Sequence, residues 1–520
     1  MFDLVLRGGT VIDGSGDPVP IRADVATRVG RIVAIGDLGE RAHDAREVLD
    51  VSGRVVAPGF IDPHTHIEPA LLAGRADGTA LLRQGITTVL LGADGFGWAP
   101  LPADDAWRLW MATAGIQGPV PAHLQTETVE AYLAALDGAP VNVLPQVPHH
   151  AVRFAGAGWA NGRVADDGIA RMRRSVEAWL DAGATGLSVG LDYEPGSRAD
   201  AVEIETLCRD VARVGGTLSA HIRYTDLGRT AGWDEVVGIA ERTGVRLVVA
   251  HERQDEVGVA ALAIARSRVD VRFESYPYEA ASTQLPAYLR RADRIGGPAA
   301  IAARLRDPAV ARRIAPRLQE DLGAEIDLGD RFVVANAADP SRIGVDLAGA
   351  AAAAGLDVGT YAVRLLRDDP DALFVIHHDR ADGPAITMRT LADPAALVAS
   401  DGIYVPGRIH PRAHGTFPRV LRAALDGDLG VDLASAVHAM TGRTADAYRV
   451  PARGRLVVGA VADVVVLDPT TVRDGATWDD PRGRPVGIEH VLLGGALALR
   501  DGDLADIRLG SVLSAGSPAT

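Results

Sequence analysis

The sequence predicts an α/β protein with a (β/α)8 barrel of the TIM type, joined to a small β-sandwich domain formed by both chain ends. First, eight short apolar runs lie between residues 55 and 402, with amphipathic helical stretches between several of them; this is typical of a (β/α)8 barrel. Second, both ends of the chain alternate apolar and polar residues between Gly and Asp turns, which indicates antiparallel strands. Third, 520 residues exceed what one barrel alone needs.

These patterns also predict where the domains begin and end. We expect residues 1–57 and 448–510 to pair as the small β-domain, and residues 58–447 to form the barrel. The stretch 279–371 is too long for a simple connection, so we predict an insertion with helices of its own over the barrel mouth. The polar end of the chain, 511–520, is expected to be a disordered tail.

The predicted barrel strands follow one another through the middle of the chain. They are residues 55–64, 85–94, 141–149, 184–193, 216–224, 246–253, 269–278 and 396–402. Helical patterns over 201–216 and 233–244 separate three of them. Because barrel enzymes place their chemistry at the carboxyl ends of the strands, we expect functional residues there.

Composition narrows the class of protein. The formal net charge of −15 argues against a nucleic-acid partner. No run of about 18 apolar residues and no signal-like amino terminus is present, so we expect no membrane association and a cytoplasmic location. The single cysteine, Cys208, fits a reducing compartment. The expected partner is a small molecule, and a homo-oligomer stays open.

One residue type is missing altogether. All 53 basic residues are arginine, and the chain contains no lysine. This excludes a Schiff base, a phosphate-loop lysine and a carboxylated lysine that bridges two metal ions.

Histidines and carboxylates gather at the ends of the predicted strands. His64 and His66 are two apart in an extended stretch, so their side chains project to the same face and could share a metal ion. Alone, they could equally be surface or hydrogen-bonded loop histidines. Further candidates end the other predicted strands: Asp94, His149, His221, His251 and Asp401. Such clustering favours a metal site, because imidazole and carboxylate are standard Zn²⁺ ligands.

Several motifs point to a known family. "PGFIDPHTH" and "GAVADVVVLDP" are shared by many amidohydrolases, whereas "GLSVGLDYEPG", "ESYPYEAAST", "SDG" and "HPRAHGTFPRVL" are more specific. Over nearly its whole length the sequence resembles the amidohydrolase superfamily, and within it the N-acyl-D-amino-acid deacylases (D-aminoacylases). The resemblance implies a zinc-dependent hydrolase, with one or two Zn²⁺ per chain, that cleaves the amide bond of N-acyl-D-amino acids or similar compounds.

The resemblance also implies a set of metal ligands. The family's ligands fall on His64, His66, His221, His251 and Asp401. The family has a cysteine ligand after the second strand, but this chain reads "GADGFGWAP" and has Asp94 there. A carboxylate can still bind or bridge metal ions, but it is a harder ligand than a thiolate and should hold Zn²⁺ less selectively. The absence of lysine independently favours the deacylase branch.

The ligands suggest how the reaction would proceed. A metal-activated hydroxide would attack the amide carbonyl. We expect Asp401 to act as the general base that passes its proton to the departing nitrogen, although it could be a metal ligand only. His149 could donate to the oxyanion, or it could equally be a packing histidine.

A deacylase also needs a group that binds the substrate carboxylate. Where the family has a lysine, this chain places Arg253 two residues after His251, and arginine can hold a carboxylate through two parallel hydrogen bonds. The alternative is that Arg253 pairs permanently with Glu252, Glu274 or Glu279.

The matching family stretches add hydroxyl groups around the expected site. These are Tyr193, Tyr276, Tyr278 and Ser282. Of the two tyrosines in "YPY", we expect only one to face the site. Glu194 and Glu274 depart from the family pattern, and either could reach the metals. Two rival functions remain open: an amidohydrolase acting on another C–N bond, such as a cyclic amide or a cyclising, amidine-forming reaction, and a non-catalytic scaffold.

Overall fold

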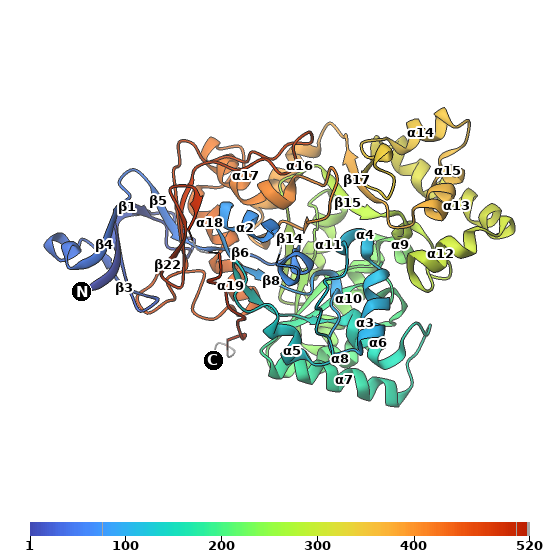
Figure 1. Ribbon diagram of the computed structural model, residues 1–520, viewed down its shortest axis with the longest axis horizontal. Coiled ribbons are helices and arrows are strands. Elements are labelled where there is room, and N and C mark those ends of the chain that lie inside the picture. Colours follow the sequence, from blue (N-terminus) through green and yellow to red (C-terminus); the bar gives the residue numbers. More distant parts are fainter. Residues whose placement is uncertain (75, 506, 517–520) are drawn as a thin grey trace.

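The computed structural model describes residues 1–74, 76–505 and 507–516. Figure 1 shows three parts along the longest axis. A sheet made by both chain ends lies at one end, an α/β part lies in the centre, and a group of helices spanning α12 (Gly297–Leu305) to α15 (Val358–Asp368) lies at the other end.

The central part is built on parallel strands. One sheet has the order β6 (Phe60–Asp62), β8 (Ile86–Leu90), β9 (Asn142–Leu144), and a pair joins β7 (Thr65–His66) to β19 (Gly402–Ile403). A six-stranded sheet runs β10 (Val147–Pro148), β11 (Gly186–Gly190), β12 (Thr217–His221), β13 (Arg246–Val249), β14 (Val271–Ser275), β18 (Ala396–Val398). Each predicted barrel strand contains at least one of these strands, so the predicted α/β class and its strand positions are confirmed.

The sequence of these strands explains their central position. All residues of β8 ("ITTVL") and β11 ("GLSVG") are buried, as expected for parallel strands covered on both faces. Helices on the outside supply the cover, among them α7 (Asp166–Asp181), α8 (Ala201–Arg213), α10 (Arg229–Thr243) and α11 (Glu256–Arg266). In α8 the Asp200 side chain accepts from Glu203 N and begins the helix, while Leu207 and Val211 face the core.

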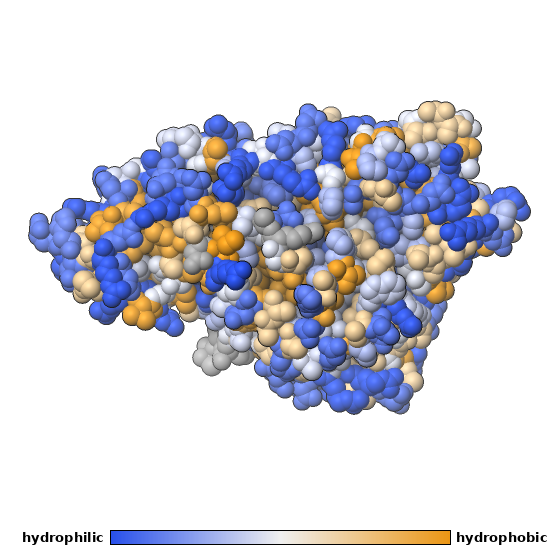
Figure 2. Space-filling model, in the orientation of Figure 1, coloured by the Kyte–Doolittle hydropathy of each residue, from blue (hydrophilic) through white to orange (hydrophobic). Residues whose placement is uncertain are grey.

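The terminal sheet joins the two ends of the chain. Its nine strands are β1 (Phe2–Val11), β2 (Ile21–Arg28), β3 (Arg31–Gly36), β4 (Ala45–Asp50), β5 (Val55–Pro58), β20 (Val464–Leu467), β21 (Ile488–Leu493), β22 (Ala496–Arg500) and β23 (Asp503–Leu504). The two ends meet where β5 pairs antiparallel with β20. On the face shown in Figure 2, hydrophobic side chains gather over this part, and hydrophilic residues cover both ends of the long axis.

The prediction that the terminal strands are antiparallel is wrong for two pairs. Strands β4 and β5 both run parallel to β1. The reason is a turn at Val51–Arg54, where Arg54 N donates to Val51 O, so that the chain continues along β1 in the same direction. Strand β4 pairs with the first half of β1, and β5 pairs with its last two residues, Thr10 and Val11.

The segment between β14 and β18 contains a small α/β unit. Its three strands, β15 (Ala280–Gln284), β16 (Asp330–Asn336) and β17 (Leu373–His378), are antiparallel in the order β15-β17-β16. Helix α13 (Pro308–Asp327) packs against α15, and Leu318, Phe332 and Leu366 belong to a core of their own. The domain boundaries given above stay predictions.

The carboxyl end differs from the expected disordered tail. Val143 N donates to Ser511 O, Leu513 N donates to Val143 O, and Leu513 is buried. Residues 511–516 therefore continue the packing of the central part, whereas 517–520, the rest of the expected tail, lie outside the described residues.

Within residues 1–74, 76–505 and 507–516, no helix combines the length and apolar character needed to cross a membrane.

Candidate metal centre and active-site cavity

The histidines and carboxylates predicted as metal ligands come together at the carboxyl ends of the central strands. His64 and His66 follow β6, Asp94 follows β8 in the short turn η3 (Ala93–Gly95), His221 ends β12, His251 follows β13, and Asp401 lies between β18 and β19. Apart from His251, which is partly buried, all are buried. The strand pattern thus brings residues more than 300 positions apart into one place.

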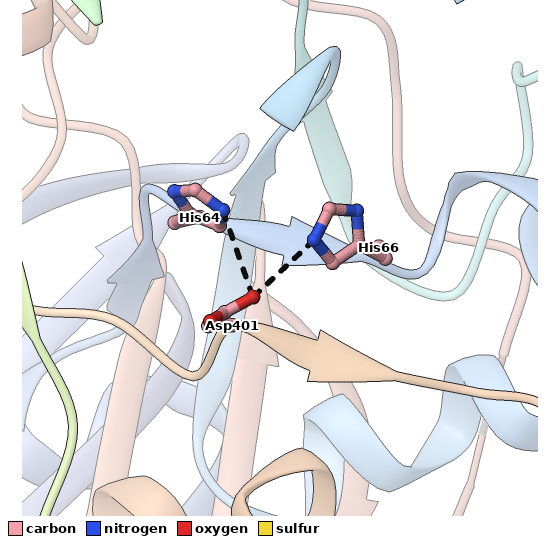
Figure 3. A group of neighbouring side chains, drawn as sticks. All are labelled: His64, His66 and Asp401. Carbon is pink, nitrogen blue, oxygen red and sulfur yellow. Dashed lines mark ion pairs between the residues drawn. The ribbon is translucent and has the colours of Figure 1, made fainter. Parts of the chain in front are cut away.

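One group of three side chains shares the Asp401 carboxylate. Asp401 Oδ1 lies 3.2 Å from His66 Nε2 and 3.7 Å from His64 Nε2 (Figure 3). The Asp401 backbone N also donates to His64 O at 2.8 Å, which fixes the two loops together. These three residues could hold a metal ion.

A second group is centred on Asp94. Its Oδ1 lies 3.4 Å from His64 Nε2 and 3.8 Å from both His251 Nε2 and His221 Nδ1. His64, Asp94 and His251 could hold a metal ion, and His221 Nδ1 is 2.8 Å from His251 Nε2. His64 therefore belongs to both groups, and Asp94 takes the central position.

The donor atoms of this cluster suit a cation. Both His64 Nε2 and Asp94 Oδ1 are buried and make no well-directed hydrogen bond within the part of the chain that the structure describes. Leaving such atoms unpaired is costly. A metal ion ligated by imidazole nitrogens and carboxylate oxygens would remove that cost.

Charges in the cluster are set by burial and by neighbours. Burial opposes ionisation of Asp94, but His64 and His221 hold the pKa of its carboxyl well below the ordinary value. Burial is also unfavourable for charged Asp401, but the Arg412 guanidinium, 2.8 Å away, lowers the pKa of that carboxyl. Burial lowers the pKa of His251 to about 3, so its imidazole is neutral, the form that binds metal.

Three of the candidate ligands have an unusual backbone. Asp94, His251 and Asp401 adopt positive φ angles of 54°, 37° and 46°. Residues other than glycine seldom occupy this left-handed region, because Cβ crowds the backbone there. Three of the seven non-glycine residues that have a positive φ in the described part of the chain are therefore candidate ligands.

A cavity of about 700 Å³ opens over the cluster. Its wall includes His66, Asp94, His221, His251 and Asp401. All the predicted substrate-binding residues also line it: Arg253, Tyr193, Tyr276, Tyr278 and Ser282. Both tyrosines of "YPY" do so, contrary to the expectation of one. The far wall comes from the unit inserted between β14 and β18, through residues such as Tyr288, Glu325 and Asp330.

Arg253 does not make the ion pairs considered as its alternative role. Among the described residues, no carboxylate oxygen lies within 4.0 Å of its guanidinium. The Glu252 carboxylate instead accepts from Arg229 and from Trp233 Nε1. The Glu274 carboxylate contacts His64 and Tyr448. Arg253 thus brings to the cavity a positive charge that these neighbours do not neutralise.

The sequence did not reveal the role of Arg412. This arginine is 1% exposed, contacts Asp401 Oδ2 at 2.8 Å and lies over the Tyr276 ring at 4.4 Å. It occurs in the motif "HPRAHGTFPRVL", but its distance from Asp401 could be known only from the folded chain.

His149 lies away from the cavity. It begins α6 (His149–Ala157), and its Nε2 is 2.9 Å from Glu203 Oε1 on α8. Glu203 also pairs with Arg153, and all three side chains are buried. This geometry does not support the predicted oxyanion role. The Glu194 carboxylate likewise has partners outside the cluster: it accepts from the Ser197 hydroxyl and pairs with Arg198.

The sequence and the fold of this chain are similar to those of known proteins. The model of the Amidohydrolase family matches residues 47–498. The chain is 34% identical to a D-aminoacylase of Alcaligenes xylosoxydans xylosoxydans, over 99% of this chain and 98% of that protein. It is also 34% identical to the N-acyl-D-glutamate deacylase of Bordetella bronchiseptica in a crystal structure with zinc and a phosphonate inhibitor (TM-score 0.81; 99% of this chain and 100% of that chain). A D-hydantoinase structure shares the fold, with 15% identity, a TM-score of 0.58 and full coverage of both chains.

Proposed function

The chain belongs to the Amidohydrolase family, and from that premise we propose that it is a zinc-dependent hydrolase that cleaves the amide bond of N-acyl-D-amino acids or compounds of similar shape. The buried cluster of His64, Asp94 and Asp401 at the base of the cavity carries this proposal. The relatives with deacylase names support the substrate class.

The residues present fit one or two zinc ions. One ion would be held by His64, His66 and Asp401, or by His64, Asp94 and His251 with His221 beside them. With two ions bound, the single lone pair of His64 Nε2 would ligate only one of them. When bound, zinc supplies Lewis acidity toward the amide carbonyl and activates water near neutral pH.

Asp401 is the side chain best placed to move a proton. Its Oδ1 faces His66, whereas its Oδ2 is held by Arg412. The carboxylate is thereby fixed in orientation, with one oxygen directed at the cluster. We assign Oδ1 as the atom that takes a proton from water and gives it to the departing nitrogen.

The arginines of the cavity account for recognition of an acid. Arg253 lies in the wall without a carboxylate partner among the described residues, and Arg412 lies deeper, beside Tyr276. A buried or half-buried cation is stabilised when it meets negative charge. We assign Arg253 to the substrate carboxylate, with hydroxyl groups of Tyr193, Tyr276, Tyr278 and Ser282 nearby.

The fold proposed for this function is a closed barrel with an attached sandwich. Closure is supported by the β7–β19 pair and by the hydrogen bonds that join Ser400 N to Asp62 Oδ1 and Asp401 N to His64 O. For the sandwich, support comes from Ile32 N, which donates to Ala460 O and so links β3 to the segment before β20. We also propose a cytoplasmic location, since the one cysteine, Cys208, is buried and free.

A metal count on purified protein beside a substrate panel tests this function. The panel contains N-acyl-D-amino acids, their L-enantiomers and cyclic amides. We expect bound zinc and turnover of the D-amides. Turnover of cyclic amides alone would replace the proposed substrate class, and protein that neither holds nor responds to any transition metal would rule out the proposed chemistry.

Arg253 allows a sharper test of the substrate carboxylate. Arg253→Met should lower kcat/KM for an N-acyl-D-amino acid by about 2–5 kcal/mol, as expected when one partner of a buried charge pair is removed. The matching carboxamide should lose much less. Arg380→Met serves as a matched control, because Arg380 also lines the cavity but lies beside Asp330. Equal losses on acid and carboxamide would make Arg253 a structural residue.

A further inference from the structure

We propose that Glu274 and Tyr448 are positioning residues that hold the His64 ring with Nε2 directed at the metal centre. The inference rests on the proposed function, because it assumes that His64 is a ligand. It assigns a role to Glu274, a residue that departs from the family pattern, and to a tyrosine that the motifs did not indicate.

The three side chains form a chain of contacts that leads away from the cluster. Glu274 lies on β14 and is fully buried, and its Oε2 is 2.9 Å from His64 Nδ1. Its other oxygen, Oε1, accepts from the Tyr448 hydroxyl. Tyr448 ends α19 (Gly442–Tyr448), is fully buried and lies 3.3 Å from Ser219 Oγ.

This arrangement selects one form of the imidazole. A carboxylate can only accept a hydrogen bond, so the proton of a neutral His64 belongs on Nδ1, facing Glu274. The lone pair of Nε2 is then free to bind a metal. That atom lies 3.4 Å from Asp94 Oδ1 and has no well-directed hydrogen bond among the described residues. Because His64 belongs to both candidate metal groups, the orientation of its ring affects both.

The Tyr448 hydroxyl holds the Glu274 carboxylate, and this carboxylate in turn holds the His64 ring. Without the hydroxyl, Glu274 Oε1 would be left without this donor in a fully buried position, which favours rotation or protonation of the carboxyl. His221 shows a related arrangement, since its Nε2 lies 3.2 Å from Asp192 Oδ2, and Asp192 in turn accepts from Tyr224 N. Two histidines of the cluster are thus each held by a carboxylate that has further partners.

The test measures metal affinity in Glu274→Gln, Tyr448→Phe and the double variant. Zinc affinity is obtained by competition with a chelator, and the absorption spectrum of the cobalt-substituted protein reports ligand geometry. We expect Glu274→Gln to weaken zinc binding by about 10- to 100-fold and Tyr448→Phe to weaken it less. The double variant should resemble Glu274→Gln alone, because both act through His64.

Glu203→Gln is the matched control. Glu203 is also a buried carboxylate in contact with a histidine, but His149 lies away from the cavity. This variant should unfold at a lower temperature and keep zinc affinity within about twofold of wild type.

The outcomes separate this inference from the proposed function. Wild-type protein without metal affinity would contradict the function itself. Wild-type affinity retained in both Glu274→Gln and Tyr448→Phe, with an unchanged cobalt spectrum, would overturn the positioning role and leave the function intact. If Glu274→Gln does not fold, Tyr448→Phe, which keeps the ring, decides by the same measurements.

Discussion

Two buried histidine–carboxylate clusters lie in the central part of the molecule, one around Asp94 and the other around Glu203. Around Glu203, each carboxylate oxygen has a partner, His149 for Oε1 and Arg153 for Oε2. Around Asp94, three imidazole nitrogens lie within 4 Å of Oδ1, yet that oxygen makes no hydrogen bond among the described residues.

The difference teaches how to distinguish a binding centre from a structural network. Both clusters combine a buried carboxylate with histidine, but Arg153 belongs only to the one around Glu203. What differs is the central carboxylate: both Glu203 oxygens are paired, whereas Asp94 Oδ1 faces imidazole nitrogens beside a cavity without a hydrogen bond among the described residues. Only the second arrangement gains free energy when a cation arrives.

The largest effect is expected for Asp94→Ala. Removal of the central carboxylate should cause loss of bound metal together with a fall in turnover of roughly 10³-fold, the equivalent of several kcal/mol of charge stabilisation. Metal analysis and kinetics on the same preparation check this. Asp94→Cys is the companion variant and should keep the metal, because thiolate is a good zinc ligand. Full metal content and normal turnover in Asp94→Ala would remove the distinction between the clusters.

Asp401→Asn tests whether Asp401 moves a proton or serves only as a metal ligand. The amide keeps the size and one acceptor oxygen of Asp401 but cannot take a proton, so turnover should fall by roughly 10²-fold. Metal content should change little. If metal and activity disappear in step, Asp401 serves only as a ligand and a different group moves the proton.

His149→Asn tests whether the cluster around Glu203 is structural. Glu203 loses a partner in a buried position, so the free energy of unfolding should fall by about 1–3 kcal/mol. Turnover per folded molecule should stay within about threefold of wild type, because His149 does not line the cavity. Urea unfolding and kcat/KM are measured side by side, and a large loss of kcat with unchanged stability would restore the catalytic role predicted from the sequence.

The smallest effect concerns the pH dependence of His150, the neighbour of His149. Burial lowers the pKa of His150 to about 3, whereas the unfolded chain takes up a proton below its ordinary pKa of 6.5. The unfolded state therefore binds more protons between these values, and stability falls with pH from about 6.5 downward by roughly 1.4 kcal/mol per pH unit. Between pH 7 and pH 5, the free energy of unfolding of the wild-type protein should fall by about 2 kcal/mol more than that of His150→Gln. Urea unfolding at several pH values measures this difference. Parallel curves for variant and wild type would show that His150 is protonated in the folded chain.

The sequence predicted the candidate metal ligands better than the cluster around Glu203. His64, Asp94 and Asp401 follow short apolar runs, and the barrel rule puts such positions at one end of the fold. His149 also follows an apolar run, but a helix begins at that residue, and the side chain turns toward α8 instead. Local pattern alone does not tell a strand end from a helix start one residue later.

Other features depended on contacts between distant segments. Arg412, on α17 (Arg412–Asp426), contacts Asp401, and Tyr448, on α19, contacts Glu274. No spacing in the sequence indicates these partners. Strands β4 and β5 run parallel to β1 because of one turn at Val51–Arg54. The alternation of apolar and polar residues does not reveal how such a turn sets the direction of a strand.

The positive φ angles of Asp94, His251 and Asp401 have a consequence for protein engineering. Glycine would relieve about 1 kcal/mol or more of strain at each position. At 94 and 251, glycine would remove this strain and a candidate ligand in one step. At 401 it would also leave the buried Arg412 guanidinium without its carboxylate partner, which costs more than the strain. A thermostability screen of this chain should therefore also measure activity for variants at 94 and 251, where the substitution that relieves backbone strain removes a candidate ligand.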